Sequence, residues 1–286
     1  MPSAKPALTE TSYGKSRIRL VQVTRRGDRH ELRDLTVAVA FEGDYDTSYT
    51  DGDNRDVLPT DTMKNTVYAL AAREGAGEPE AFGMMLGRHF IERNPKLACV
   101  NVDLVDHGWS HIADGAREHG QAFVRRGPEV RTARIVTSRN GVTAAAGISD
   151  LIIMKTSRSA FADFPRDEFT TLPETHDRLL ATALTATWTY RETDVEFGPV
   201  FRSVRSTLLD AFAVHDSLSV QHTLYAMGEA ALSACADATS ITLTLPNRHH
   251  LLVDLKPFGL DNPNEIFVAT DQPFGLIEAT ITRNPS

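Results

Sequence analysis

Polar side chains that suit the recognition of a planar anion stand at the ends of predicted strands and helices. They are Lys15 before the first strand, Thr60 and Asp61 at the start of a helix, Arg178 at the start of a long strand, Gln221 near the start of another helix, and Asn247 with His249 at a strand break. Arginine and glutamine together offer planar sets of donors that suit a flat anionic heterocycle. An aromatic ring such as Phe161 would stack on it, and a threonine with a nearby lysine and histidine would relay protons. The spacing along the chain does not by itself bring these residues together.

Each of these residues also has a plain structural explanation. A threonine or aspartate at the start of a helix caps it, a surface lysine is solvated, and an asparagine at a break serves a turn. Arg178 has two carboxylates nearby in the sequence, Glu174 and Asp177, with which it would form a salt bridge. Gln221 would be a capping or an exposed residue. Taken singly, these explanations are simpler than a site, so both interpretations stay open.

The stretch VLPTDTMKNTVYALA (57–71) predicts a helix that starts at its Thr-Asp pair and runs to about Glu74. Met63, Val67 and Leu70 recur at helical spacing and form one apolar face. The start of a helix carries free N–H groups and a partial positive charge. The Thr-Asp pair therefore suits a bound anion as well as a cap.

The elements that would position these residues follow the order strand, strand, helix, helix, strand, strand. In the first half, strict alternation through 35–41 predicts a strand with one buried face, paired as a hairpin with the strand before it. The helix that starts at Thr60 and runs to about Glu74 follows, and then a second helix at 78–94. Alternation returns through 100–104, and a short strand at 121–126 would complete the half.

The second half repeats this order. An Asn140-Gly141 turn between alternating runs predicts a hairpin. A long strand at 178–191 precedes helices at 198–215 and 219–236. The segments ITLTLPN and HHLLVDLK are then predicted to be two strands with a break at Asn247-Arg248.

The sequence therefore predicts an α+β protein built from two tandem antiparallel ββααββ units, residues 1–138 and 139–286, rather than a βαβ series. No low-complexity linker separates the halves, so we expect one fused structure. The sheets of such units leave edges to be paired, and assembly of several chains would pair them. We therefore expect a homo-oligomer.

Composition excludes several classes of protein. The 286 residues carry a formal net charge of -8, which argues against a general nucleic-acid binder. No apolar run approaches the roughly 18 residues of a membrane span. The N-terminal MPSAKPALTETSYG lacks the apolar region of a secretory signal, and the C-terminal TITRNPS lacks an SKL-type peroxisomal address. We expect a cytoplasmic protein without nucleic-acid or membrane partners.

The common motifs of metal, nucleotide and serine-nucleophile sites are absent. The ten histidines include no HExxH pair, and His249 and His250, as neighbours on a predicted strand, would point to opposite faces. Cys99 and Cys235 form no CxxC pair, which disfavours a disulfide framework and fits a reducing compartment. No GxGxxG, GxxxxGK[ST] or GxSxG pattern occurs. A metal site is therefore not expected.

Segments spread over nearly the whole chain resemble the uricase (urate oxidase) family, in the family's order. They are YGK (13–15), TDTMKNTVYALA (60–71), RDEFTTLPETHDR (166–178), SVQHTLY (219–225), LPNRH (245–249) and PFGLIEATI (273–281). The resemblance implies the tunnelling fold (T-fold), in which two ββααββ units per chain assemble as a homotetramer around a β-barrel tunnel. It also implies oxidation of urate by O2 and water to 5-hydroxyisourate and hydrogen peroxide, with no metal or organic cofactor.

The resemblance assigns catalytic roles to three residues. Thr60 matches the family's catalytic threonine, Lys15 its partner lysine and His249 the histidine of the proton relay. Asp61 matches a position whose backbone touches the ligand. Lys15, Thr60 and Asp61 would come from one subunit and the remaining site residues from its neighbour.

The other matches concern binding. Arg178 and Gln221 match the pair that clamps the edge of urate, and Phe161 matches the ring that stacks on it. Asn247 matches the asparagine that faces the dioxygen or water site, and Val220 a position whose backbone touches the ligand.

Two alternatives remain at this stage. The first is another tunnelling-fold enzyme for purines or pterins, of the cyclohydrolase or aldolase type; these rely on a glutamate anchor, and many need zinc. The second is a purine-binding oligomer without catalysis. The residues alone indicate a cytoplasmic, duplicated α+β oligomer, and they leave an anion site as one of two open interpretations of the polar residues.

Overall fold

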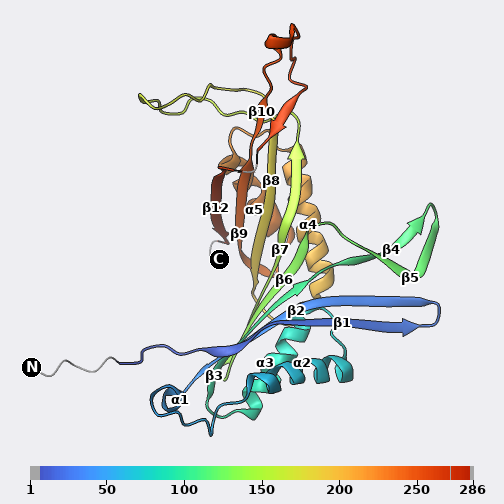
Figure 1. Cartoon of the computed structure of the whole chain (residues 1–286), viewed down its shortest axis with the longest axis vertical. Helices are drawn as coiled ribbons and strands as arrows, with labels where there is room; N and C mark the ends of the chain where they lie inside the picture. The colour runs from blue at the N-terminus through green and yellow to red at the C-terminus, as the bar shows by residue number, and fades with distance from the viewer. Residues whose placement is uncertain (1–6, 271, 284–286) are drawn as a thin grey trace, which may run out of the picture. The chain divides into compact units, whose positions relative to one another are not determined.

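The structure is a computed structural model that describes residues 7–270 and 272–283 (Figure 1). Residues 1–6 and 284–286, on which part of the localisation prediction rests, lie outside this range. The chain forms two compact units. Unit 1 is Met1–Ala146 with Glu192–Phe197, and unit 2 is Gly147–Arg191 with Gly198–Ser286. The proposed division of the repeat at 138/139 stays a prediction.

Unit 1 contains an antiparallel sheet with helices packed on it (Figure 1). Its strand order is β1 (Tyr13–Arg26), β2 (Arg29–Gly43), β3 (Leu97–Asp106) and β6 (Val130–Ser138). The short helix α1 (Asp46–Thr50) follows β2, α2 (Thr60–Glu74) packs against β1, and α3 (Pro79–Arg93) packs against β3 and β6. The core side chains on β2, β3, α2 and α3 include the predicted sets Leu35, Val37, Val39, Phe41, Val100, Val102, Leu104, Met63, Val67, Leu70, Phe82, Leu86 and Phe90. The predicted apolar faces are thus confirmed, except that Met85, which shares the helical spacing of Phe82, Leu86 and Phe90, is only half-buried.

The strand predicted at 121–126 exists but does not complete the sheet. It is part of β5 (Arg117–Arg125), which pairs with β4 (Trp109–Asp114) in a separate hairpin. The fourth strand is β6, which pairs with β3 from Cys99↔Ser138 to Asp106↔Arg131. Alternation identifies a strand but not its partner, because pairing depends on residues distant in sequence.

Unit 2 is again an antiparallel sheet with helices. Strand β7 (Gly141–Lys155) crosses the unit boundary and neighbours β8 (Leu180–Tyr190), followed in the sheet by β9 (Ala238–Arg248) and β12 (Gly275–Thr282). The helices are α4 (Phe197–Val214) and α5 (Val220–Ala234), of which α5 packs against β9 and β12. The predicted core residues of β8 and α4 are buried, namely Leu180, Leu184, Trp188, Tyr190, Val204, Leu208 and Phe212. Phe201, predicted in phase with the α4 set, is only half-buried.

The end of the chain differs from the prediction. Strand β9 continues through Asn247 to Arg248, so the break falls at His249. The segment HHLLVDLK supplies only β10 (His250–Leu252), which pairs with β11 (Phe267–Ala269) in a small separate hairpin. A 3-10 turn, η1 (Lys256–Phe258), lies between them. The sheet partner of β9 is β12, which the alternation analysis did not predict.

The α+β class and the antiparallel units are confirmed. None of the helices within residues 7–270 and 272–283 has the length and apolar character of a membrane span.

Close packing of α3 on β6 leads to a stability prediction. A Cβ placed on Gly87 would lie 2.1 Å from Oγ1 and 2.9 Å from Cβ of Thr137, a buried residue of β6. Gly87→Ala should therefore destabilise the protein by about 1–3 kcal/mol through overpacking, although alanine gains about 1 kcal/mol in helix propensity. Urea unfolding would measure this. Arg88→Ala, an exposed neighbour on α3, is the control; equal stability of Gly87→Ala and wild type would contradict the packing.

Candidate active site

A cavity of about 420 Å³ lies in unit 2, at the ends of strands β8 and β9. Arg178, Asn247 and His249, three of the predicted site residues, line it. The remaining lining residues are 156, 172–175, 177, 179, 250–252, 264 and 267, and include Glu174, His250, Asn264 and Phe267. The fold of this unit thus brings together side chains that are about 70 positions apart in the sequence.

Strand alternation explains why these residues meet. On β9, Leu243 and Leu245 are buried in the core, and Asn247 follows them on the same face. Asn247 pairs with Thr182 of β8, and Arg178 stands just before that strand. The core face of the sheet therefore turns from apolar to polar where the strands end, and the cavity begins there.

Arg178 has an unusual environment for a cation. Its Nε is buried and has no hydrogen-bond partner, and the guanidinium forms no salt bridge within the described part of the chain. Asp177, predicted as a possible partner, instead accepts a hydrogen bond from the backbone N–H of Arg158 at 2.8 Å. Burial without a neighbouring anion lowers the pKa of Arg178. The salt-bridge explanation is therefore wrong, and the guanidinium is available to an anionic ligand.

Backbone hydrogen bonds fasten Phe161 beside Arg178. The N–H of Phe161 donates to the carbonyl of Thr175 at 2.7 Å, and the reverse bond measures 3.0 Å. The N–H of Arg178 donates to the carbonyl of Ser159 at 2.8 Å. The guanidinium carbon lies 5.3 Å from the centre of the Phe161 ring, a cation–π contact, and that ring stacks on Phe164 at 4.9 Å. Phe161 is not among the residues that line the cavity, so its contact with a ligand stays a prediction.

Backbone hydrogen bonds from the same segment, residues 159–161, also reach the residues before α5. The N–H of Ala160 donates to the carbonyl of Ser217 at 2.7 Å. Ser219 caps α5 with its side chain, so the capping role considered for Gln221 belongs to Ser219. Val220 is buried, whereas Gln221 is exposed. Neither of these two lines the cavity, and their ligand contacts stay predictions.

His249 stands between β9 and β10 rather than on a strand. The argument that His249 and His250 point to opposite faces of one strand therefore does not apply, and both line the cavity. The carbonyl of His249 accepts a hydrogen bond from the N–H of Thr270 at 2.9 Å, which ties the residue to the end of β11. Among the described residues, no three His, Cys, Asp or Glu side chains gather to hold a metal.

Lys15, Thr60 and Asp61 belong to unit 1. Lys15 lies on β1 opposite Val39, immediately before a register shift that ends at Ile18. A Cβ on Gly14 would lie 2.0 Å from the carbonyl oxygen of Val39, so only glycine allows β1 to approach β2 this closely. The glycine and the irregularity together fix how Lys15 leaves the strand.

Thr60 is the first residue of α2, and no side chain caps this helix. The carboxylate of Asp61 instead bonds to Lys64 and, at 3.0 Å, to the amide of Asn65. The hydrogen bond from Lys64 lowers the pKa of Asp61, and the charge of Lys15 contributes to this shift. The capping explanation for Thr60 and Asp61 is therefore wrong, and Lys15 lies close enough to interact with the start of α2.

Sequence analysis missed several residues of the cavity. Glu174 was considered only as a salt-bridge partner of Arg178, and His250 only as the strand neighbour of His249, yet both line the cavity. Asn264 comes from the irregular stretch between β10 and β11, where neither alternation nor a helical period marks a position. Outside the cavity, Cys99 and Cys235 are both free thiols, and burial raises the pKa of Cys99.

Known proteins match almost the whole chain. The family model described as Uricase matches residues 11–136 and 144–278. A uricase of Arthrobacter globiformis is 46% identical, covering 99% of this chain and 92% of the relative. A uricase of Dictyostelium discoideum is 35% identical, covering 98% of both.

Solved structures give the same result. The crystal structure of the Arthrobacter globiformis uricase matches with a TM-score of 0.94 over 99% of this chain and 97% of that one, at 46% identity. A uricase structure from Bacillus fastidious shares the fold, with a TM-score of 0.82 over 95% of this chain and 93% of that one, at 24% identity. The family model and the curated relatives cover almost the whole sequence. The chain therefore belongs to the uricase family.

Proposed function

We propose that this protein oxidises urate with O2 and water to 5-hydroxyisourate and hydrogen peroxide. Family membership supports the reaction, and the cavity of unit 2 supports an anionic, planar substrate. The observation that carries the proposal is the partly buried guanidinium of Arg178, which has no carboxylate partner within the described residues. The cyclohydrolase- or aldolase-type alternative has no support from the relatives.

Each site residue then has a task. Arg178 and Gln221 bind the edge of the urate anion, and Phe161 stacks on its ring. Val220 and Asp61 contribute backbone contacts at helix starts, where N–H groups favour an anion. Asn247 faces the place of dioxygen or water. The protein holds electron-rich urate against O2, so that most of its contribution is positioning and charge stabilisation.

Protons move through Lys15, Thr60 and His249. The ammonium of Lys15 lowers the free energy of a deprotonated Thr60 or water, and His249 carries the proton. A homotetramer completes the site, because Lys15 and Thr60 of one subunit act with the unit 2 residues of its neighbour. No resident cofactor takes part in the proposed reaction.

The first test is an assay on protein treated with a chelator. Urate loss is followed by ultraviolet absorbance while peroxide is measured in parallel. Equal rates of both without added metal are expected. Activity that returns only with zinc would contradict the proposal, and urate binding without turnover would favour the non-catalytic alternative.

Arg178→Gln should weaken urate binding. Loss of charge-assisted hydrogen bonds, each of about 1.5–3 kcal/mol, should raise KM by about 10–100-fold. Steady-state kinetics would measure this. Arg158→Gln is the control, because that exposed arginine bonds to Asp216 and the carbonyl of Val214 outside the cavity. An unchanged KM in Arg178→Gln would show that the anion binds elsewhere.

Mixed oligomers test the shared site. Thr60→Ala and Arg178→Gln should each lower activity, Thr60→Ala by about 100-fold in kcat. Co-expressed and assembled at random, the two variants should recover up to about one quarter of wild-type activity, because one site in four would combine intact Thr60 and Arg178. Thr60→Ala with Lys15→Met should recover nothing, since both residues come from the same subunit. No recovery in the first mixture would contradict a site shared between subunits.

A further inference from the structure

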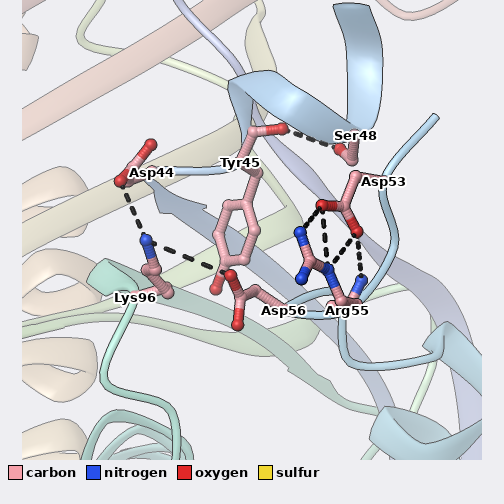
Figure 2. Close-up of polar contacts among 7 residues, drawn as sticks. All are labelled: Asp44, Tyr45, Ser48, Asp53, Arg55, Asp56 and Lys96. Atoms are coloured by element: carbon pink, nitrogen blue, oxygen red, sulfur yellow. Dashed lines mark hydrogen bonds and ion pairs between the residues drawn. The ribbon is translucent and has the colours of Figure 1, made fainter. Parts of the chain in front are cut away.

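The loop between α1 and α2 leads directly into Thr60. Figure 2 shows Lys96 between two carboxylates, that of Asp44 before α1 at 3.2 Å and that of Asp56 within the loop at 4.0 Å. All three side chains are about half exposed or more, so these ion pairs contribute little to holding the loop. A less exposed contact must hold the last part of the loop in place.

That contact is a hydrogen bond to Tyr13. The N–H of Leu58 donates to the hydroxyl oxygen of Tyr13 at 3.1 Å. Leu58 stands two residues before Thr60, and Tyr13 stands two residues before Lys15. One hydrogen bond therefore joins the two backbone segments that present the proposed catalytic pair.

Aromatic packing fixes Tyr13 itself. Its ring meets Tyr45 edge-on at 5.0 Å and Phe41 at 5.7 Å. Tyr45 is only 3% exposed, and its hydroxyl lies near enough to that of Tyr13 for each to raise or lower the other's pKa. In Figure 2, Tyr45 lies between the Lys96 pairs and α1, at the base of the loop. Packing against Tyr45 and Phe41 thus holds the Tyr13 ring, and its oxygen accepts the bond from the Leu58 N–H.

The hydroxyls of Tyr13 and Tyr45 do not readily lose their protons. Burial raises the pKa of Tyr13, and burial together with the proximity of Tyr13 raises that of Tyr45 further. Both groups remain neutral at ordinary pH, so their contacts keep the same form throughout that range. A role in holding backbone, rather than in proton transfer, fits them.

We propose that Tyr13 is a positioning residue: its hydroxyl, supported by Tyr45 and bonded to the Leu58 N–H, sets the place of Thr60 relative to Lys15. This inference rests on the proposed function of Thr60 and Lys15. The inference concerns Thr60 and Lys15 only and assigns nothing new to Arg178, which belongs to unit 2.

Tyr13→Phe keeps the ring and removes the hydroxyl. We expect kcat to fall by roughly 10–100-fold, since a shift of about 1 Å in a reacting group has that effect. KM for urate and the thermal midpoint should stay near wild type. Tyr49→Phe is the matched control, because it removes a tyrosine hydroxyl from the same region, one that makes an exposed 3.3 Å bond to the Ser12 carbonyl instead of to the Leu58 N–H. Wild-type kcat in Tyr13→Phe would overturn the proposal.

Tyr45→Phe separates positioning from packing. Tyr45→Phe removes the Tyr45 hydroxyl and leaves the bond between the Leu58 N–H and Tyr13 in place. Its kcat should therefore fall less than that of Tyr13→Phe. A merely structural role predicts the reverse order, because Tyr45 is the more deeply buried of the two. Hydrogen exchange should be faster at the Leu58 amide in Tyr13→Phe than in wild type, and unchanged exchange would contradict the bond.

A double-mutant cycle identifies the residue through which Tyr13 acts. In a Thr60→Ala background, Tyr13→Phe should have little further effect on kcat. Additive losses, or a shifted pH profile of Tyr13→Phe, would overturn positioning through Thr60. Failure of the proposed function appears differently: wild type itself would not oxidise urate, while the exchange experiment would still decide whether the Tyr13 hydroxyl holds the loop.

Discussion

Alternation of side chains across the antiparallel sheet of unit 2 is the constraint on which the candidate site depends. It sends Leu243 and Leu245 into the core and leaves Asn247 on the same face at the end of β9. A shift of one residue in register would turn Asn247 away from the cavity and expose the leucines. The burial of apolar surface in this unit therefore also maintains the geometry of its polar end.

A second constraint is the cost of burying an unpaired cation. Desolvation disfavours the charged form of Arg178, and within the described residues no carboxylate offsets that cost. The N–H of Arg178 donates to the Ser159 carbonyl, and Phe161 and Thr175 exchange two backbone hydrogen bonds beside it. These bonds hold the arginine in a partly buried position. Stability gained elsewhere in the unit supports this arrangement, which a bound anion would relieve.

Much of the fold could be predicted from sequence, because apolar periodicity reports burial directly. The faces of α2, α3, β2 and β8 follow this rule, and all are buried as predicted. Partner choice could not be predicted this way: the segment at 121–126 is a strand, yet β6 takes the sheet position. Strand β12 was not predicted from apolar periodicity. Most of its residues are exposed in the single chain, so it has no buried apolar face for that periodicity to report.

The candidate site was predictable only in part. Residue types suggested an anion site, but only the structure shows that no carboxylate of the described residues forms a salt bridge with Arg178. Asp177, adjacent in sequence, bonds to a backbone N–H instead. Likewise, the capping explanation for Asp61 failed because Lys64 and Asn65 compete for its carboxylate. Local sequence shows which partners are near, whereas the fold decides which of them is used.

The free thiols bear on the durability of a protein that releases peroxide. Peroxide attacks the thiolate far more readily than the thiol. Burial raises the pKa of Cys99, so little thiolate is present at neutral pH, and Cys235 lies within the core of unit 2. Both cysteines are therefore less open to oxidation by peroxide than a fully exposed thiol would be.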